Sequence, residues 1–340
     1  MSLKIKIAVT LGSILLIALI LYLRKDYCKC KDRISYQHID LNKEIDLDVL
    51  YTPTDSTELQ NILLSWKNFS EESDTYQTVN KSGYFYNRNL LVVRHTVHGA
   101  KHYGAIVLPK DYDENKKYPL LVWANGLDQS NPTVDLRGLG KVFMRLKDYF
   151  ILVPSYRGQA LVANGRRYCS DGFFGDAFDG ATDDALRLLA LAKSEFKGID
   201  NNRVVVSGTS RGGTVALLMG IRDPGINAVI SIAAPTNFFS EEMYNRYTKQ
   251  YKYQFLSHKK TIGAIRAKMI KSSPIYFVEK YPNALLLIHG ENDKIVPVSH
   301  AHKVIAKLKQ KENFEYRITD QGHAIDNQTL YIMDWLRQHN

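Results

Sequence analysis

The chain has 340 residues, a formal net charge of +10 at neutral pH and 45% hydrophobic residues. This length fits one large α/β domain with an additional segment, and the composition excludes a disordered or low-complexity protein. Its three cysteines cannot form a framework of several disulfides, and Cys28 and Cys30 lack the second ligand pair of a zinc site. We expect Cys169 to be a structural thiol.

Residues 7–23 form an uncharged apolar stretch near the start of the chain. As a helix it would be about 25 Å long, the low end of what spans a bilayer. No small residues suited to signal cleavage follow it, so we expect an uncleaved single-pass anchor in membrane lipid over residues 1–33, with an atypical signal peptide as the alternative. The basic residues after the span favour a catalytic domain on the cytoplasmic side of the membrane. The short basic start resembles an export signal and favours the opposite side, so the sequence does not decide the orientation.

Residues 34–102 are typical of an N-terminal extension made of a helix and edge strands. Apolar side chains share one face over 57–69, after capping residues at 54–56, which predicts the helix. Apolar residues alternate over 83–108, which predicts antiparallel strands. Three histidines lie close together in these strands: His95, His98 and His102. No cysteine or carboxylate stands at ligand spacing with them, so we expect surface histidines rather than a metal site.

From residue 119 onwards, strands alternate with helices, which predicts a parallel sheet with crossover helices. The expected strands are 120–124, 150–154, 203–207, 228–233, 284–289 and 314–319. The expected helices lie near 135–146, 180–193, 214–221, 300–311 and 327–338. Residues 236–283, here called the helical insertion, interrupt the pattern where open α/β folds bind ligands. They carry nine Lys and Arg against three Glu, so we expect a lid whose positive potential attracts anionic substrates, with a solvated basic face against acidic lipid headgroups as the alternative.

The clearest local motif runs from a strand into a helix around Ser210. Three valines at 204–206 are typical of a buried strand, and good helix formers follow from Thr214. Between them stands Gly-Thr-Ser-Arg-Gly at 208–212, an example of G-x-S-x-G. This spacing holds a serine in a strained turn and lifts its hydroxyl above the sheet, so we expect Ser210 to be a nucleophile. A dinucleotide-binding loop is disfavoured because the glycines do not follow G-x-G-x-x-G.

Two further residues follow later strands in the order that an acyl-transfer site needs. Asp293 comes after the strand at 284–289, and His323 comes after the strand at 314–319. The order Ser, Asp, His is that of α/β-hydrolases. His323 would take the proton of Ser210, and Asp293 would hold the imidazole and stabilise its charged form. We therefore expect an α/β-hydrolase fold over residues 103–340, with a mostly parallel sheet and helices on both faces.

A serine hydrolase also needs backbone N–H groups for the oxyanion. One donor is expected to be Arg211, directly after the nucleophile. The second should come from the loop at 123–128, where Leu127 is the candidate. Asn125-Gly126 stands in this loop where many hydrolases carry His-Gly.

Five aspartates are concentrated in one segment of the chain: Asp171, Asp176, Asp179, Asp183 and Asp184. Their spacing does not match a calcium-binding EF-hand loop, so we expect loop and helix-cap carboxylates. The sequence predicts neither a metal nor a cofactor.

From about Tyr103 to its end, roughly two thirds of its length, the chain resembles the prolyl oligopeptidase (S9) group of α/β-hydrolases. The motifs are Ser-Tyr-Arg-Gly at 155–158, the Ser210 turn with Gly212-Gly213, Ala-Pro-Thr at 234–236, Ser273-Pro274, His-Gly-x-x-Asp-x-x-Val-Pro at 289–297 and Gly322-His323. The resemblance implies a triad of Ser210, Asp293 and His323. The chain departs from the group in two respects: only about eighty residues could precede the catalytic part where large members carry a β-propeller, and Asn125 replaces the usual histidine.

The functional hypothesis is a membrane-anchored serine hydrolase that acts on peptides or small esters, with peptidase placed ahead of carboxylesterase or deacetylase. A non-catalytic binding protein on the same scaffold is the first alternative. Tyrosines and basic residues interleave at 244–253, which could also stack nucleic-acid bases. At helical spacing these tyrosines fit a lid better, so no nucleic-acid partner is expected.

Overall fold

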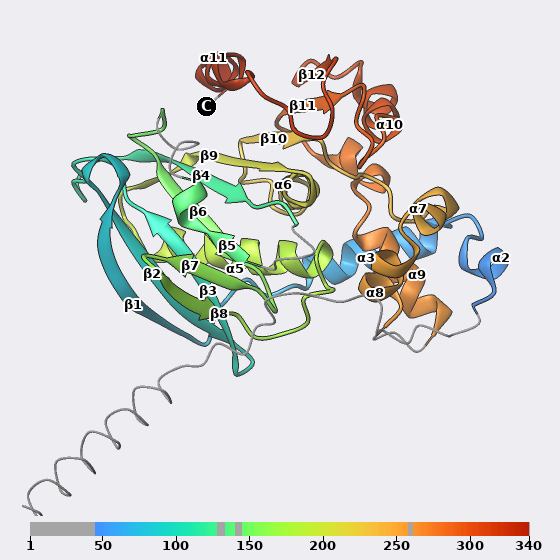
Figure 1. The fold of residues 1–340 in the computed structure, drawn as a ribbon, viewed down its shortest axis with the longest axis horizontal. Coiled ribbons are helices and arrows are strands. Elements are labelled where there is room, and N and C mark those ends of the chain that lie inside the picture. Colours follow the sequence, from blue (N-terminus) through green and yellow to red (C-terminus); the bar gives the residue numbers. More distant parts are fainter. Residues whose placement is uncertain (1–44, 128–132, 140–144, 258–260, 340) are drawn as a thin grey trace, which may run out of the picture.

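The computed structural model describes residues 45–127, 133–139, 145–257 and 261–339 (Figure 1). The expected membrane anchor at 1–33 lies outside these ranges. Within them, no helix is both long enough and apolar enough to cross a bilayer. The anchor therefore stays a prediction.

The described chain forms one large sheet in the order β1-β2-β3-β6-β4-β9-β10-β11-β12. Six neighbouring strands run parallel: β6 (Phe150–Ser155), β4 (Tyr118–Ala124), β9 (Ile199–Thr209), β10 (Ala228–Ile232), β11 (Ala284–Gly290) and β12 (Phe314–Thr319). Antiparallel pairing extends the sheet through β3 (Ala100–Val107), β2 (Arg88–Val97) and β1 (Thr75–Tyr84). The expected mostly parallel sheet is confirmed, and the pairing of β2 with β3 crosses the proposed boundary at residue 102.

Successive side chains of each strand point to opposite sides of the sheet, and both faces are covered by other elements. On β4, Leu120 and Val122 belong to one core and Leu121 to the other. The first face packs against α5 (Asp179–Glu195), α6 (Arg211–Arg222) and α10 (Ser299–Leu308). The second packs against α11 (Thr329–His339), α4 (Leu136–Leu139) and a small sheet of β5 (Thr133–Asp135), β7 (Ala160–Ala163) and β8 (Arg166–Cys169). Of the helix expected near 135–146, the described residues show only α4.

The helical insertion lies between β10 and β11, as predicted. Its elements are α7 (Glu241–Arg246), α8 (Thr248–Phe255), α9 (Ile262–Lys271), η3 (Pro274–Tyr276) and η4 (Val278–Lys280). Two N-terminal helices lie beside it: α2 (Leu47–Leu50) and α3 (Ser56–Lys67) (Figure 1). Asp55 caps α3 by accepting a hydrogen bond of 2.7 Å from the Glu58 N–H, as its sequence suggests.

The insertion and the N-terminal helices share a third apolar core, which includes Leu50, Ile62, Phe239 and Met269. Arg266 on α9 reinforces the contact. Its guanidinium donates to the Leu50 carbonyl at 2.6 Å and pairs with Glu58 at 2.9 Å. The residues before β1 therefore help to hold the insertion in place.

Two of the three neighbouring histidines are buried, which corrects the expectation that all three are surface residues. His95 on β2 faces His102 on β3 in the strand register, with ring centroids 5.6 Å apart. His98 lies at the exposed turn between the strands. Burial and, to a smaller extent, the neighbouring His102 together lower the pKa of His95 from 6.5 to about 4. Alternation on two strands predicted the pairing pattern, but not the elements that cover this face.

Cys169, at the end of β8, is disulfide-bonded. The expectation that it is a free structural thiol is therefore wrong. Cysteine number and spacing could not reveal this, because bridge formation depends on the distance between Cα atoms in the fold.

The buried His95 predicts an acid-sensitive fold. Its pKa is lower in the folded chain than in the unfolded chain, so its contribution to stability is present above pH 6.5 and is lost as pH falls to about 4. His95→Gln should flatten the dependence of the free energy of unfolding on pH by up to about 3 kcal/mol between pH 7 and 4. Urea denaturation at several pH values measures this. The exposed control His98→Gln should keep the native slope, and equal slopes in all three proteins would contradict the assignment.

Candidate active site

Ser210 lies in the sharp turn between β9 and α6 with φ of 58° and ψ of −122°. A left-handed φ at a residue with a side chain is strained, as the motif predicts. The turn passes so close to β4 that a Cβ at Gly208 would lie 2.5 Å from the Ala124 carbonyl oxygen. A Cβ at Gly212 would overlap the same oxygen and lie 2.6 Å from the Ala124 carbonyl carbon. Glycine is thus required at both positions by close approach.

The helix that follows Ser210 starts with backbone donors available for an anion. The Ser210 N–H donates to the Ile232 carbonyl at 2.8 Å, which fixes the turn to β10. Within the described residues, the Arg211 N–H has no acceptor. Since the N-terminal end of a helix carries partial positive charge, this N–H is suited to hold a developing oxyanion.

Asp293 and His323 form a hydrogen-bonded pair. The Asp293 carboxylate is buried, and its Oδ1 accepts bonds of 2.8 Å from the Ile295 and Val296 N–H groups. Its Oδ2 lies 2.8 Å from His323 Nδ1. An ionised carboxylate can only accept, so Nδ1 is the donor and the Nε2 lone pair remains for a proton. His323 is partly exposed, with a side-chain accessibility of 20%.

The three expected residues follow β9, β11 and β12, whose carboxyl ends lie at one edge of the sheet. In the described residues, no hydrogen bond joins the Ser210 hydroxyl to His323. In enzymes without substrate, catalytic hydrogen bonds are often long or poorly aligned and form fully only in the substrate complex.

His289, which belongs to the His-Gly-x-x-Asp motif at 289–293, also contacts Asp293 and its loop. Its Nε2 donates to the Val296 carbonyl at 2.9 Å and lies 3.5 Å from Asp293 Oδ2. Burial lowers the pKa of His289, so its neutral form is favoured. It is a fourth polar side chain at this edge of the sheet, and its hydrogen bond to the Val296 carbonyl holds the Asp293 loop in place.

The loop after β4 is bound to the nucleophile turn by the Arg211 side chain. The guanidinium donates to the Gly126 carbonyl at 2.7 Å and to the Asn125 carbonyl at 3.1 Å. Residues 128–132 lie outside the described structure. The sequence predicted Arg211 for its backbone N–H, and gave no sign of this side-chain contact.

The helical insertion reaches the site loops through Arg246 of α7, whose guanidinium donates to the Lys294 carbonyl next to Asp293. Two other basic side chains of the insertion are neutralised elsewhere: Arg266 by Glu58, and Lys268 by Asp179 at 3.0 Å. The positive potential expected from the net charge of the insertion is thus reduced.

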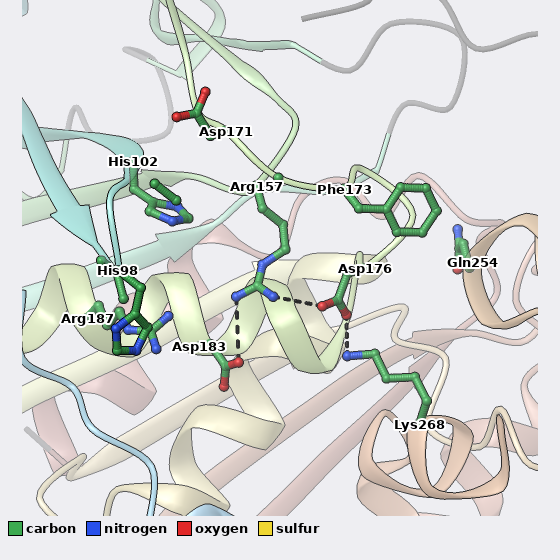
Figure 2. Close-up of a pocket in the computed structure, with 13 residues that line it drawn as sticks. His98, His102, Arg157, Asp171, Phe173, Asp176, Asp183, Arg187, Gln254 and Lys268 are labelled. Atoms are coloured by element: carbon green, nitrogen blue, oxygen red, sulfur yellow. Dashed lines mark hydrogen bonds and ion pairs between the residues drawn. The ribbon is translucent and has the colours of Figure 1, made fainter. Parts of the chain in front are cut away.

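A cavity of about 450 Å³ lies beside the insertion. Its lining residues, which include His102, Arg157, Phe173, Arg187 and Lys268, are drawn in Figure 2. Its lining includes none of Ser210, Asp293 and His323. The cavity is therefore separate from the candidate catalytic residues, and its size alone does not make it the reaction site.

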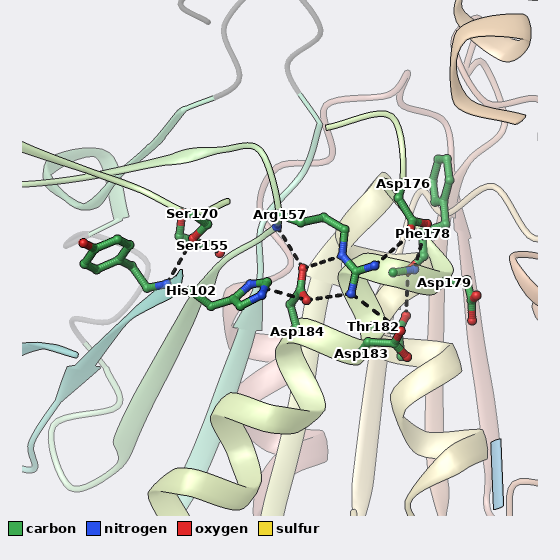
Figure 3. A network of polar contacts seen from close by, with 12 residues as sticks. His102, Ser155, Arg157, Ser170, Asp176, Phe178, Asp179, Thr182, Asp183 and Asp184 are labelled. Atoms are coloured by element: carbon green, nitrogen blue, oxygen red, sulfur yellow. Dashed lines mark hydrogen bonds and ion pairs between the residues drawn. The ribbon is translucent and has the colours of Figure 1, made fainter. Parts of the chain in front are cut away.

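The clustered aspartates form an ion-pair network (Figure 3). Arg157 binds Asp184 through Nη2 at 2.8 Å and Asp176 through Nη1 at 2.7 Å, and Arg222 binds Asp183 at 2.7 Å. Burial alone would raise the pKa of Asp184, but Arg157 holds it below its ordinary value. No group of metal-ligating side chains occurs in the part of the chain that the structure describes. Four of the aspartates pair with arginines or a lysine, which the sequence did not predict. As expected of loop and cap carboxylates, Asp171 accepts a hydrogen bond from the Lys101 N–H at 2.9 Å, and Asp176 accepts one from the Gly180 N–H at the start of α5.

The sheet order, the strained serine between a strand and a helix, and the Asp–His pair are the features of an α/β-hydrolase fold. The sequence model of the prolyl oligopeptidase family matches residues 138–339. The chain belongs to this family, and the resemblance stated from its motifs is confirmed.

Among curated relatives, dipeptidyl peptidase 8 of Mus musculus is 23% identical over 262 residues, which cover 69% of this chain and 27% of that protein. Dipeptidyl-peptidase 5 of Porphyromonas gingivalis is 28% identical over 206 residues, which cover 58% of this chain and 28% of that protein. The chain thus spans about a quarter of the length of these relatives.

Two solved structures share the fold over most of this chain. Acetyl xylan esterase 1 from Thermoanaerobacterium matches with a TM-score of 0.62 and 16% identity, over 87% of this chain and 99% of that one. Acetyl xylan esterase from Paenibacillus sp. R4 matches with a TM-score of 0.64 and 17% identity, over 87% and 100%. At this identity the likeness concerns the fold alone.

The contact of Lys268 with the aspartates predicts that this side chain secures the insertion to the body. Its ammonium is largely buried and pairs with Asp176 and Asp179. Lys268→Met removes the cation and leaves buried carboxylates without it, which should cost about 3 kcal/mol of unfolding free energy. Lys271→Met, on the same helix and half-buried, should cost less than about 1 kcal/mol. Urea denaturation compares the two, and equal losses would contradict the role of Lys268.

Proposed function

We propose that this chain is a serine peptidase of its family that works through an acyl-enzyme, with Ser210 as nucleophile, His323 as base and Asp293 as the residue that orients the base. The observation that supports this most directly is the 2.8 Å contact between Asp293 and His323 at the same sheet edge as the strained Ser210 turn. No cofactor is needed for this chemistry.

In the proposed reaction, His323 Nε2 takes the proton of the Ser210 hydroxyl while Oγ attacks the substrate carbonyl carbon. The carbonyl oxygen becomes an oxyanion, which accepts hydrogen bonds from the backbone N–H groups of Arg211 and Leu127. The imidazolium of His323, stabilised by ionised Asp293, gives its proton to the leaving amine as the C–N bond breaks. Water then attacks the acyl-enzyme with His323 as base, which releases the acid and restores the Ser210 hydroxyl.

Family membership and the dipeptidyl peptidase relatives support an amide substrate. Since about three quarters of those proteins has no counterpart in the match, their dipeptide preference is not carried over. Small-ester hydrolysis is the second candidate function. It is favoured by a fold shared with nearly the whole of two acetyl xylan esterases, over 87% of this chain.

The triad predicts that Ser210→Ala, Asp293→Asn and His323→Ala each lower kcat by about 10³-fold or more. Their losses should not add, because the three residues act as a unit. Initial rates for the single variants and the triple variant test this, with the exposed His302→Ala of α10 as the histidine control. Native turnover in folded Ser210→Ala would refute the proposed mechanism.

Peptidase and esterase functions are separated by substrates that share one acyl group. An amide leaving group needs a proton from His323 before the C–N bond breaks, whereas p-nitrophenolate leaves unaided. If the chain is a peptidase, it should cleave a series of acyl-peptide amides, and kcat/KM should rise as residues are added to the peptide. It should also cleave the matched acyl p-nitrophenyl esters. Cleavage of acetyl and other short esters, with no measurable hydrolysis of any amide, would assign the esterase function instead.

A further inference from the structure

Arg211 carries a guanidinium that is almost entirely enclosed by protein. The residue is 1% exposed, and the described part of the chain offers it no carboxylate partner. Burial lowers the pKa of Arg211 to about 10, still far above neutral, so the group stays charged. A buried charge without a counter-ion is costly, and an apolar side chain of similar volume would avoid that cost.

A buried guanidinium that donates only to backbone carbonyls is not by itself a sign of function, because Arg88 on β2 has the same properties. Arg88 is 3% exposed and donates to the Leu108 carbonyl at 2.7 Å and the Tyr149 carbonyl. It ties the start of β2 to the residues that follow β3 and precede β6, away from Ser210 in the sheet order. The distinguishing property of Arg211 is therefore which carbonyls it holds.

Arg211 holds the two carbonyls of the loop that is expected to supply the second oxyanion donor. Its Nη2 donates to the Gly126 oxygen at 2.7 Å, and its Nε and Nη2 donate to the Asn125 oxygen at 3.2 and 3.1 Å. The Tyr156 ring packs against the guanidinium at 4.4 Å and limits its movement. The orientation of both peptide groups is thereby fixed from one side.

In a trans peptide the C=O and N–H point in opposite directions, and the described chain contains no cis peptide. Since the guanidinium binds the Asn125 and Gly126 oxygens, the N–H groups of Gly126 and Leu127 point away from it. The loop lies against the nucleophile: a Cβ at Gly126 would lie 4.0 Å from Ser210 Cβ. Hydrogen bonds in a chain polarise one another, so a cation on each carbonyl makes the N–H on the same peptide a stronger donor.

We propose that Arg211 is a positioning residue for the oxyanion hole, which presents one donor through its own backbone and orients and polarises the loop that presents the other. The inference rests on the proposed nucleophile, Ser210. It explains why a buried charge is kept one residue after that serine. It also explains how a loop that carries Asn125 in place of histidine is held in shape.

The test compares Arg211→Met and Arg211→Gln with Arg88→Met, which removes an equally buried guanidinium elsewhere. Steady-state hydrolysis of p-nitrophenyl acetate gives kcat and KM. The inhibition constant of phenylboronic acid, which forms a tetrahedral adduct with a serine hydroxyl, reports on the oxyanion hole. We expect both Arg211 variants to lower kcat about 10²-fold, to weaken boronate binding by a similar factor and to change KM less than about threefold.

Arg88→Met should lower the melting temperature while its kcat and boronate affinity stay within about threefold of native. Arg211→Lys, which keeps the charge, should recover part of the lost kcat. If Arg211→Met does not fold, Arg211→Gln decides. Native kcat and boronate affinity in a folded Arg211 variant, when Ser210→Ala is inactive, would overturn the role of Arg211 and leave the serine mechanism intact. Activity in Ser210→Ala would instead overturn the proposed function.

Discussion

The close approach of the Ser210 turn to β4 is the constraint on which the site depends. The backbone of Gly212 lies against the Ala124 carbonyl with no room for a side chain, and the chain between β9 and α6 can pass only if Ser210 adopts a left-handed φ of 58°. Such a conformation costs about 1–3 kcal/mol, which the buried packing of β9 and α6 offsets. The same contact brings the loop after β4 beside the nucleophile. The pairing of β4 with β9 therefore accounts both for the strained backbone of Ser210 and for the position of the expected oxyanion donors.

Charged side chains hold the loops around Ser210 and the helical insertion in place. Arg211 fixes the loop after β4, and the Ile295 and Val296 N–H groups hold the Asp293 carboxylate. On the outer side, Lys268 and Arg266 secure the helical insertion to α5 and α3 through buried or half-buried ion pairs. Because breaking one partner of a buried pair is costly, these contacts favour one position of the insertion relative to the site.

Local patterns in the sequence predicted much of the fold and the candidate site. The valines at 204–206, the Gly-x-Ser-x-Gly spacing at 208–212 and the residues after β11 and β12 form short local patterns, although the space that requires Gly208 and Gly212 is set by the distant Ala124. What the sequence could not predict depends on residues far apart in the chain. The burial of His95 and His102 depends on elements that cover β2 and β3, the Arg211 contact joins residues 85 or more positions apart, and the aspartates pair with arginines from other elements. The disulfide at Cys169 likewise required three-dimensional proximity.

We propose the strained Ser210 as the activated nucleophile. The most direct measurement is covalent labelling of the folded full-length chain with a fluorophosphonate, followed by intact mass spectrometry and peptide mapping. We expect one adduct per chain, located on Ser210, whose rate of formation falls at least about 10²-fold in His323→Ala because the base is missing. Absence of an adduct on the folded protein, or an adduct on another residue, would contradict the proposal.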